Sequence, residues 1–96
     1  MKIQDKEINL KITPRAIEKA ETRSGLDILK LLREVNENEP KLSDHYKLVY
    51  AGYLGATNED INYDEFMDLV EDIDIVDIAN AGINLLIKRK NLCFIF

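Results

Sequence analysis

The sequence predicts a mainly α-helical fold of about five helices with a small N-terminal β-hairpin as a minor β component. Apolar residues alternate with polar ones near the N-terminus, and they recur every three or four positions over most of the remaining chain. Proline, glycine and asparagine interrupt the helical pattern at several points. With 96 residues the chain has the size of one domain. We therefore predict a single helical domain over residues 1–90 and an apolar C-terminal tail at residues 91–96.

The N-terminal hairpin is predicted over about residues 2–12. Ile3 precedes a short charged stretch, and every second residue from Ile8 to Ile12 is apolar after it. This alternation is typical of strands with one buried face. Since an isolated hairpin is only marginally stable, we expect this one to pack against the helices that follow.

The first helix is predicted to begin after Thr13, which can cap it, with Pro14 at the first helical position. Gly25 is expected to end this helix, because glycine readily takes the positive φ of a helix C-terminus. A second helix follows, with a wide apolar stripe that includes Leu26, Leu29, Leu32 and Val35, flanked by Ile28 and Leu31.

Two further helices are predicted in the middle of the chain. Ser43 is a candidate cap for the third helix, which we expect to close at Gly55. Asn62 and Glu65 have the spacing of a capping box, which predicts a fourth helix of about ten residues.

The fifth helix is predicted from Ile75 to about Lys88 and is apolar almost all round. One face carries Ile78, Gly82 and Leu85, and another carries Val76, Ile83 and Ile87. A helix of this kind is central or lies in an interface, so we expect it to be buried on more than one side, by the domain itself or in a homo-oligomer. The candidate partner interface combines one of its faces with a tyrosine stripe of the third helix: Val76, Ile83, Ile87, Tyr46, Tyr50 and Tyr53.

Charge is distributed unevenly along the chain. The net charge is −5, and residues 34–78 hold thirteen acidic and only two basic side chains. This balance opposes binding to nucleic acid phosphates. The acidic run fits a solvated face, a docking face for a basic partner, or a metal cluster. We take Asp64, Asp68, Glu71 and Asp72 as a candidate acidic steering face.

The stretch from Ile61 to Phe66 looks like the second half of an EF-hand calcium loop. With Glu65 as the last ligand, however, the first and third ligand positions fall on Leu54 and Ala56, which have no side-chain oxygen. The position of the turn glycine is also occupied by another residue. We therefore expect a helix cap at Asn62 and no calcium site.

The sequence offers little equipment for catalysis. The chain has one histidine, His45, and one cysteine, Cys93, and neither lies in a recognisable nucleophile setting. We predict a non-enzymatic protein without a cofactor or metal. The absence of an apolar signal region or a long apolar stretch favours a cytoplasmic protein that does not bind membranes.

The order of the segments KIQDKEINLKITPRAIEKAE, GLDILKLL, VYAGY, DINYDEFMDLVED and ANAGINLLIKR resembles the small tail assembly chaperones of long-tailed, siphovirus-type phages and prophages of Gram-positive bacteria. The resemblance covers about residues 2–90. It implies a helical protein of the host cytoplasm that binds the tape-measure protein, helps recruit tail-tube subunits, and is absent from the mature virion. The alternative is a degenerate EF-hand-like or acidic protein-binding regulator that does not bind calcium.

Overall fold

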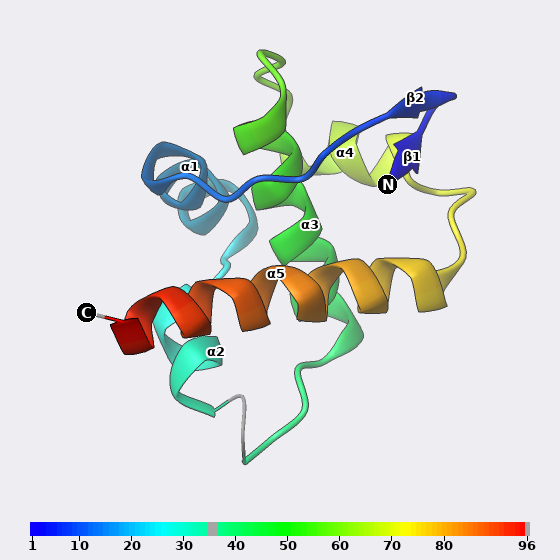
Figure 1. The fold of residues 1–96 in the computed structure, drawn as a ribbon. Helices are drawn as coiled ribbons and strands as arrows, with labels where there is room; N and C mark the ends of the chain where they lie inside the picture. Colours follow the sequence, from blue (N-terminus) through cyan, green and yellow to red (C-terminus); the bar gives the residue numbers. More distant parts are fainter. Residues whose placement is uncertain (35–36, 96) are drawn as a thin grey trace.

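The computed structural model describes residues 1–34 and 37–95, and beyond Ile87 it describes only the backbone of the last helix. It contains a two-stranded hairpin and five helices, which confirms the predicted fold class (Figure 1). The elements are β1 (Lys2–Ile3), β2 (Lys6–Glu7), α1 (Pro14–Ser24), α2 (Ile28–Glu34), α3 (Leu42–Ala56), α4 (Tyr63–Leu69) and α5 (Ile75–Ile95).

The hairpin is shorter than the sequence pattern predicted. β1 and β2 pair antiparallel through a tight turn in which both Gln4 and Asp5 have positive φ. Residues 8–12, predicted as the second strand, instead cross the molecule as an extended segment. The N–H of Lys11 donates to the carbonyl of Gly52 at 3.0 Å, so α3 supplies the hydrogen bond that a partner strand would have made.

The caps of α1 confirm the prediction from local sequence. The hydroxyl of Thr13 accepts a hydrogen bond from the N–H of Ala16 at 3.1 Å. At the other end Gly25 has a φ of 77°, a conformation that glycine adopts without the strain that a Cβ brings. The helix therefore begins and ends at the predicted residues, and Ala16, Ile17 and Ala20 are buried as expected.

Helix α2 buries a different face from the predicted one. It begins at Ile28, with the side chain of Asp27 accepting the N–H of Lys30 at 3.1 Å, and it buries Ile28 and Leu31. Leu26 is buried ahead of the helix, whereas Leu29 is 64% exposed. The predicted stripe therefore does not face the core as one unit; its last member, Val35, lies outside the described residues.

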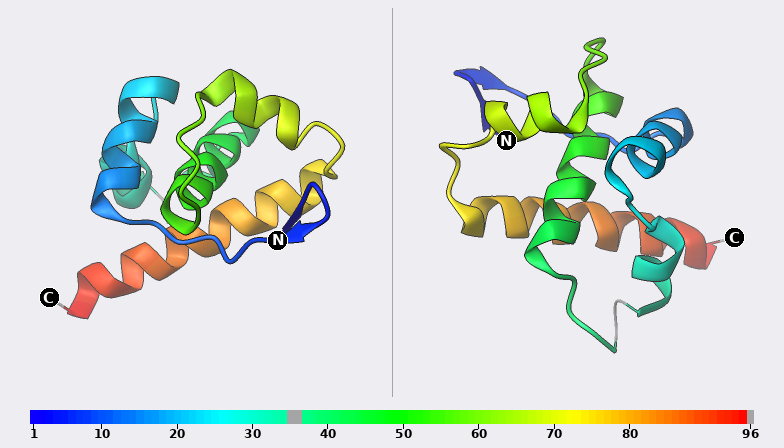
Figure 2. Two further views of the ribbon diagram at one scale, coloured as in Figure 1. Left: turned by 90° about the horizontal axis from the view of Figure 1, so that it is seen from above. Right: turned by 180° about the vertical axis from the view of Figure 1, so that it is seen from behind.

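Helix α3 occupies the centre of the domain, one of the two positions, central or in an interface, that the sequence suggested for the fifth helix. All residues from Leu48 to Leu54 are buried, and α3 contacts α1, α4 and α5 (Figures 1 and 2). Its N-cap is Lys41 and not Ser43, because the carboxylate of Asp44 accepts the Lys41 N–H at 3.0 Å. The helix continues through Gly55 and ends at Ala56.

Helix α5 lies across α3 (Figure 1). Gly82 sits at this crossing: a Cβ there would lie 2.9 Å from the Cα of His45, so glycine permits the close approach of the two helices. The helix is longer than predicted, since its backbone continues past Lys88 to Ile95 and includes most of the residues assigned to an apolar tail. Within the described chain, no helix is both long and apolar enough to cross a membrane.

Candidate functional site

The outer face of α5, which we define as Val76, Asn80, Ile83 and Ile87, points away from α3. Val76 is 60% exposed and Ile87 is 46% exposed, while Ile83 is half-buried at the edge of the core. Asn80 is exposed between them. The spacing of four, three and four residues puts all four on one side of the helix. The face therefore presents branched apolar side chains over about three helical turns.

The opposite side of α5 explains why the outer face remains exposed in a single chain. Ile78 and Leu86 are fully buried and Leu85 nearly so, and they pack on the side that crosses α3. The fifth helix is therefore buried on one side only within the domain. Of the two alternatives that the sequence left open, coverage of both sides by the domain itself is not what the structure shows, because α3 takes the central position.

The predicted interface residues are not brought together. Val76, Ile83 and Ile87 share the outer face of α5, whereas Tyr50 and Tyr53 are core residues with 0% and 5% exposure. Their assignment to a partner interface is corrected: a side chain inside the core has no surface to offer. Tyr46 is half-buried against the core. The sequence prediction missed Asn80, although its spacing from Val76 and Ile83 would have identified it.

The hydroxyls of the buried tyrosines are used inside the domain. Tyr50 donates to the carbonyl of Ile61 at 2.7 Å, and Tyr53 donates to the carboxylate of Glu59. Burial, together with the hydrogen bond to Glu59, raises the pKa of Tyr53 to about 12. These bonds attach the segment after α3 to the core, so the tyrosine stripe has a structural role in this fold.

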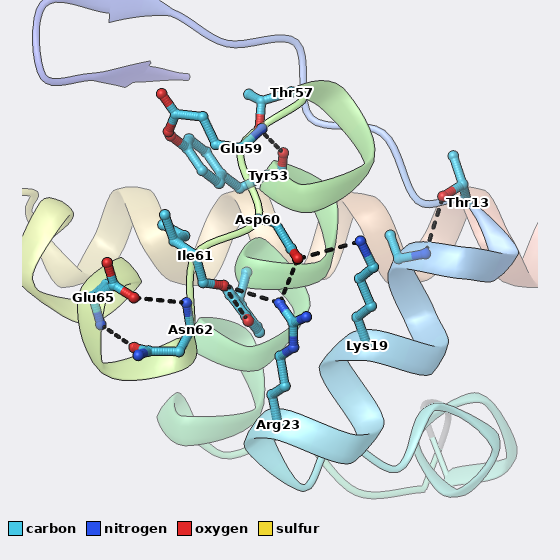
Figure 3. A network of polar contacts seen from close by, with 12 residues as sticks. Thr13, Lys19, Arg23, Tyr53, Thr57, Glu59, Asp60, Ile61, Asn62 and Glu65 are labelled. Atoms are coloured by element: carbon cyan, nitrogen blue, oxygen red, sulfur yellow. Dashed lines mark hydrogen bonds and ion pairs between the residues drawn. The ribbon is translucent and has the colours of Figure 1, made fainter.

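Part of the acidic run is also neutralised within the domain. Asp60 accepts hydrogen bonds from Arg23 at 2.7 Å and from Lys19 at 3.3 Å, both from α1 (Figure 3). These bonds, that from Arg23 foremost, hold the pKa of Asp60 below its ordinary value. The contact joins α1 to the segment between α3 and α4, two elements far apart in the sequence.

The predicted acidic steering face is exposed. Its members lie on α4 and the turn that follows, and all four are solvent-accessible: Asp64, Asp68, Glu71 and Asp72. None forms an ion pair with a basic side chain that the structure describes. With respect to the side chains that the structure describes, they therefore present negative charge without a basic partner to the surface.

The segment that resembles an EF-hand forms a helix cap. The Asn62 side chain accepts the Glu65 N–H at 2.8 Å, and the Glu65 carboxylate accepts the Asn62 N–H at 3.2 Å (Figure 3). This reciprocal pair confirms the predicted capping box. Leu54 and Ala56, at the first and third ligand positions of a calcium loop, belong to α3. Residues 54–65 thus do not have the shape of that loop.

Replacing Asn62 with alanine is expected to lower the free energy of unfolding by roughly 0.5–2 kcal/mol, because the Glu65 N–H loses its acceptor. The midpoint of urea unfolding measures the effect. Asn58→Ala is the matched control, since Asn58 is exposed in the same connecting segment and its side chain makes no hydrogen bond within the described residues. Equal midpoints for Asn62→Ala and Asn58→Ala would contradict the capping role.

The remaining candidates for chemistry lie apart from the outer face. His45 is buried at the crossing with α5, and this burial lowers the pKa of its imidazole. Cys93 is among the residues whose side chains lie outside the described part of the chain. Among the residues that the structure does describe, no group of three or more His, Cys, Asp or Glu side chains could hold a metal ion.

The outer face of α5 and the acidic steering face together define a candidate site for binding another protein. Comparisons of the chain with protein families, with curated proteins and with solved structures found no match. The function of this protein must therefore be inferred from its own residues.

Proposed function

We propose that this protein is a non-enzymatic assembly chaperone of phage tails, which binds the tape-measure protein and helps recruit tail-tube subunits. It would act in the cytoplasm of the host cell and be absent from the mature virion. The observation that carries the proposal is the outer face of α5, an apolar helix surface that the domain leaves uncovered.

Such a surface suits a long helical client. An exposed helix face with apolar residues at a spacing of three and four can pack against the apolar stripe of another amphipathic helix. Apolar burial is non-directional, so one face of this kind can serve many similar segments of one client. Val76 and Ile87 lie about three turns apart, a length that matches a short helical segment.

The acidic steering face has a separate role in this proposal. Exposed charges are screened over about 8–10 Å at physiological salt, so they act mainly on the rate of encounter. We infer that Asp64, Asp68, Glu71 and Asp72 guide basic segments of the client toward the domain, and that the apolar contact then holds them.

Co-expression with the tape-measure protein of the same gene cluster tests the proposal. We expect this chain to raise the soluble yield of that protein and to be recovered in complex with it. Ile87→Asp should abolish the gain, because it puts a charge into the apolar contact. Leu42→Asp is the matched control. Leu42, like Ile87, is a branched aliphatic residue at the surface, with 42% exposure, but it lies at the start of α3.

Two outcomes would contradict the proposal. If the tape-measure protein is equally soluble without this chain and no complex is recovered, the chaperone function is wrong. If Ile87→Asp and Leu42→Asp preserve the complex equally, the client binds elsewhere than on the outer face of α5.

The exposed acidic steering face favours one alternative, an acidic regulator that occupies a basic site on a host protein. This function requires no apolar contact with a helix. It would be supported if binding to a host protein survived Ile87→Asp and was lost when the carboxylates of Asp68, Glu71 and Asp72 were replaced by amides.

A further inference from the structure

The outer face of α5 is complementary to itself in its apolar residues. Val76, Asn80, Ile83 and Ile87 follow the alternating spacing of four and three residues that forms the seam between two packed helices. Consider two copies of α5 packed antiparallel, with the two-fold axis passing between residues 81 and 82. The N-terminal end of each seam then meets the C-terminal end of the other. Val76 of one copy then packs against Ile87 of the other, so the two most exposed apolar side chains of the seam cover each other.

The charges at the two ends of α5 are complementary in the same arrangement. The start of the helix and the turn before it carry Glu71, Asp72, Asp74 and Asp77, and the sequence places Lys88, Arg89 and Lys90 in its later turns. Asp77 is eleven residues from Lys88 on the same helix, and a rise of about 16 Å along the axis is longer than an ion pair between these two positions can span.

We propose that a second copy of this chain covers the outer face of α5, with the two α5 helices packed antiparallel about a two-fold axis. The acidic start of each helix then lies beside residues 88–90 of the other copy, and the two helix dipoles oppose each other favourably. A parallel pair would instead place like charges together at both ends. This inference does not depend on the proposed function, although a client helix and a second copy would compete for the same face.

The mass of the protein in solution tests the dimer. Sedimentation and light scattering over a wide concentration range should reveal a species of twice the 11.1 kDa chain mass. The triple variant Glu71→Lys, Asp72→Lys, Asp77→Lys leaves Asp74 as the one acidic residue of that group and so makes both ends of the helix basic. The triple variant Lys88→Glu, Arg89→Glu, Lys90→Glu makes both ends acidic. Each should raise the dissociation constant by about tenfold or more, because like charges then meet across the axis.

Combining the two sets of substitutions restores opposite charges at the two ends and should restore the dimer. Recovery by a variant with six altered charges is a result that general damage to the fold cannot produce, and circular dichroism of each variant checks that the helices persist. A wild-type chain that is monomeric at every concentration would overturn the proposal. So would an unchanged dissociation constant in both end variants, or a combined variant that remains monomeric.

Disulfide trapping tests the direction of the helices independently. In a chain with Cys93→Ser, the pair Val76→Cys and Ile87→Cys should form a covalent dimer on mild oxidation. The two cysteines cannot bridge within one chain, since they are about 16 Å apart along the helix. Val76→Cys alone should remain uncrosslinked in the antiparallel dimer. Efficient crosslinking by Val76→Cys alone would mean a parallel pair and would overturn the proposed arrangement.

Discussion

Replacing Phe66 with alanine is expected to lower the free energy of unfolding by about 3–5 kcal/mol. Phe66 is fully buried and is the one buried residue of α4. Its ring packs against Tyr50 and Tyr53 of α3, with centroid distances of 5.3 and 5.7 Å. Since small domains have a total stability of only about 5–15 kcal/mol, this variant loses a large share of it.

Urea unfolding followed by circular dichroism measures this loss. Leu29→Ala is the control, because Leu29 is exposed on α2 and its truncation should change stability by no more than about 0.5 kcal/mol. Phe66→Leu should lie between Phe66→Ala and the wild type, since it keeps most of the apolar volume. A Phe66→Ala variant as stable as Leu29→Ala would show that α4 does not depend on this ring for its attachment.

The elements that the sequence predicted well are those set by local interactions. Thr13, Gly25 and Asn62 each act on backbone groups within four residues, so their roles could be inferred from neighbouring positions. The helix ends at these three residues were accurate, whereas α4 has seven residues and not the predicted ten or so. The predicted cap of α3 was two residues too late, because Asp44 accepts the N–H of Lys41 and the helix therefore begins ahead of Ser43.

The elements that were predicted poorly depend on contacts between distant segments. Alternation from Ile8 to Ile12 is compatible with a strand, but the chain there lies on α3 through a bond between Lys11 and Gly52, 41 residues away. Likewise, an apolar stripe in the sequence does not determine which of its residues other segments of the chain will cover. Leu29 and the outer face of α5 are exposed for this reason, and Tyr50 and Tyr53 are buried for the same reason.

The candidate site was predicted in part. The apolar character of Val76, Ile83 and Ile87 is visible in the sequence, but their exposure follows from the central position of α3, which leaves α5 with one covered side. The run of seven buried residues from Leu48 to Leu54 includes both small and large side chains, so its periodicity gave no sign that this helix is enclosed on all sides.

Gly55 is the second position at which a small change should have a large effect. Gly55→Ala should lower the free energy of unfolding by about 3 kcal/mol, the upper end of the range for overpacking. A Cβ at this position would lie 1.8 Å from the carbonyl oxygen of Lys11 and 3.4 Å from the N of Thr13. Because the obstacle is backbone, no side-chain rotation can relieve the overlap, and the extended segment must move away from α3.

The displacement should also be visible locally. Lys11 donates its N–H to the carbonyl of Gly52, so hydrogen exchange at Lys11 should accelerate in Gly55→Ala. Gly52→Ala is the matched control on the same helix face: its Cβ would meet the Cβ of Leu10 and the Cδ1 of Leu85 at 3.0 Å, so its overlap is much smaller than that with the Lys11 carbonyl at Gly55. Alanine is the better helix former by about 1 kcal/mol at both positions. A Gly55→Ala variant at least as stable as Gly52→Ala would therefore mean that the extended segment does not lie against α3 at Gly55.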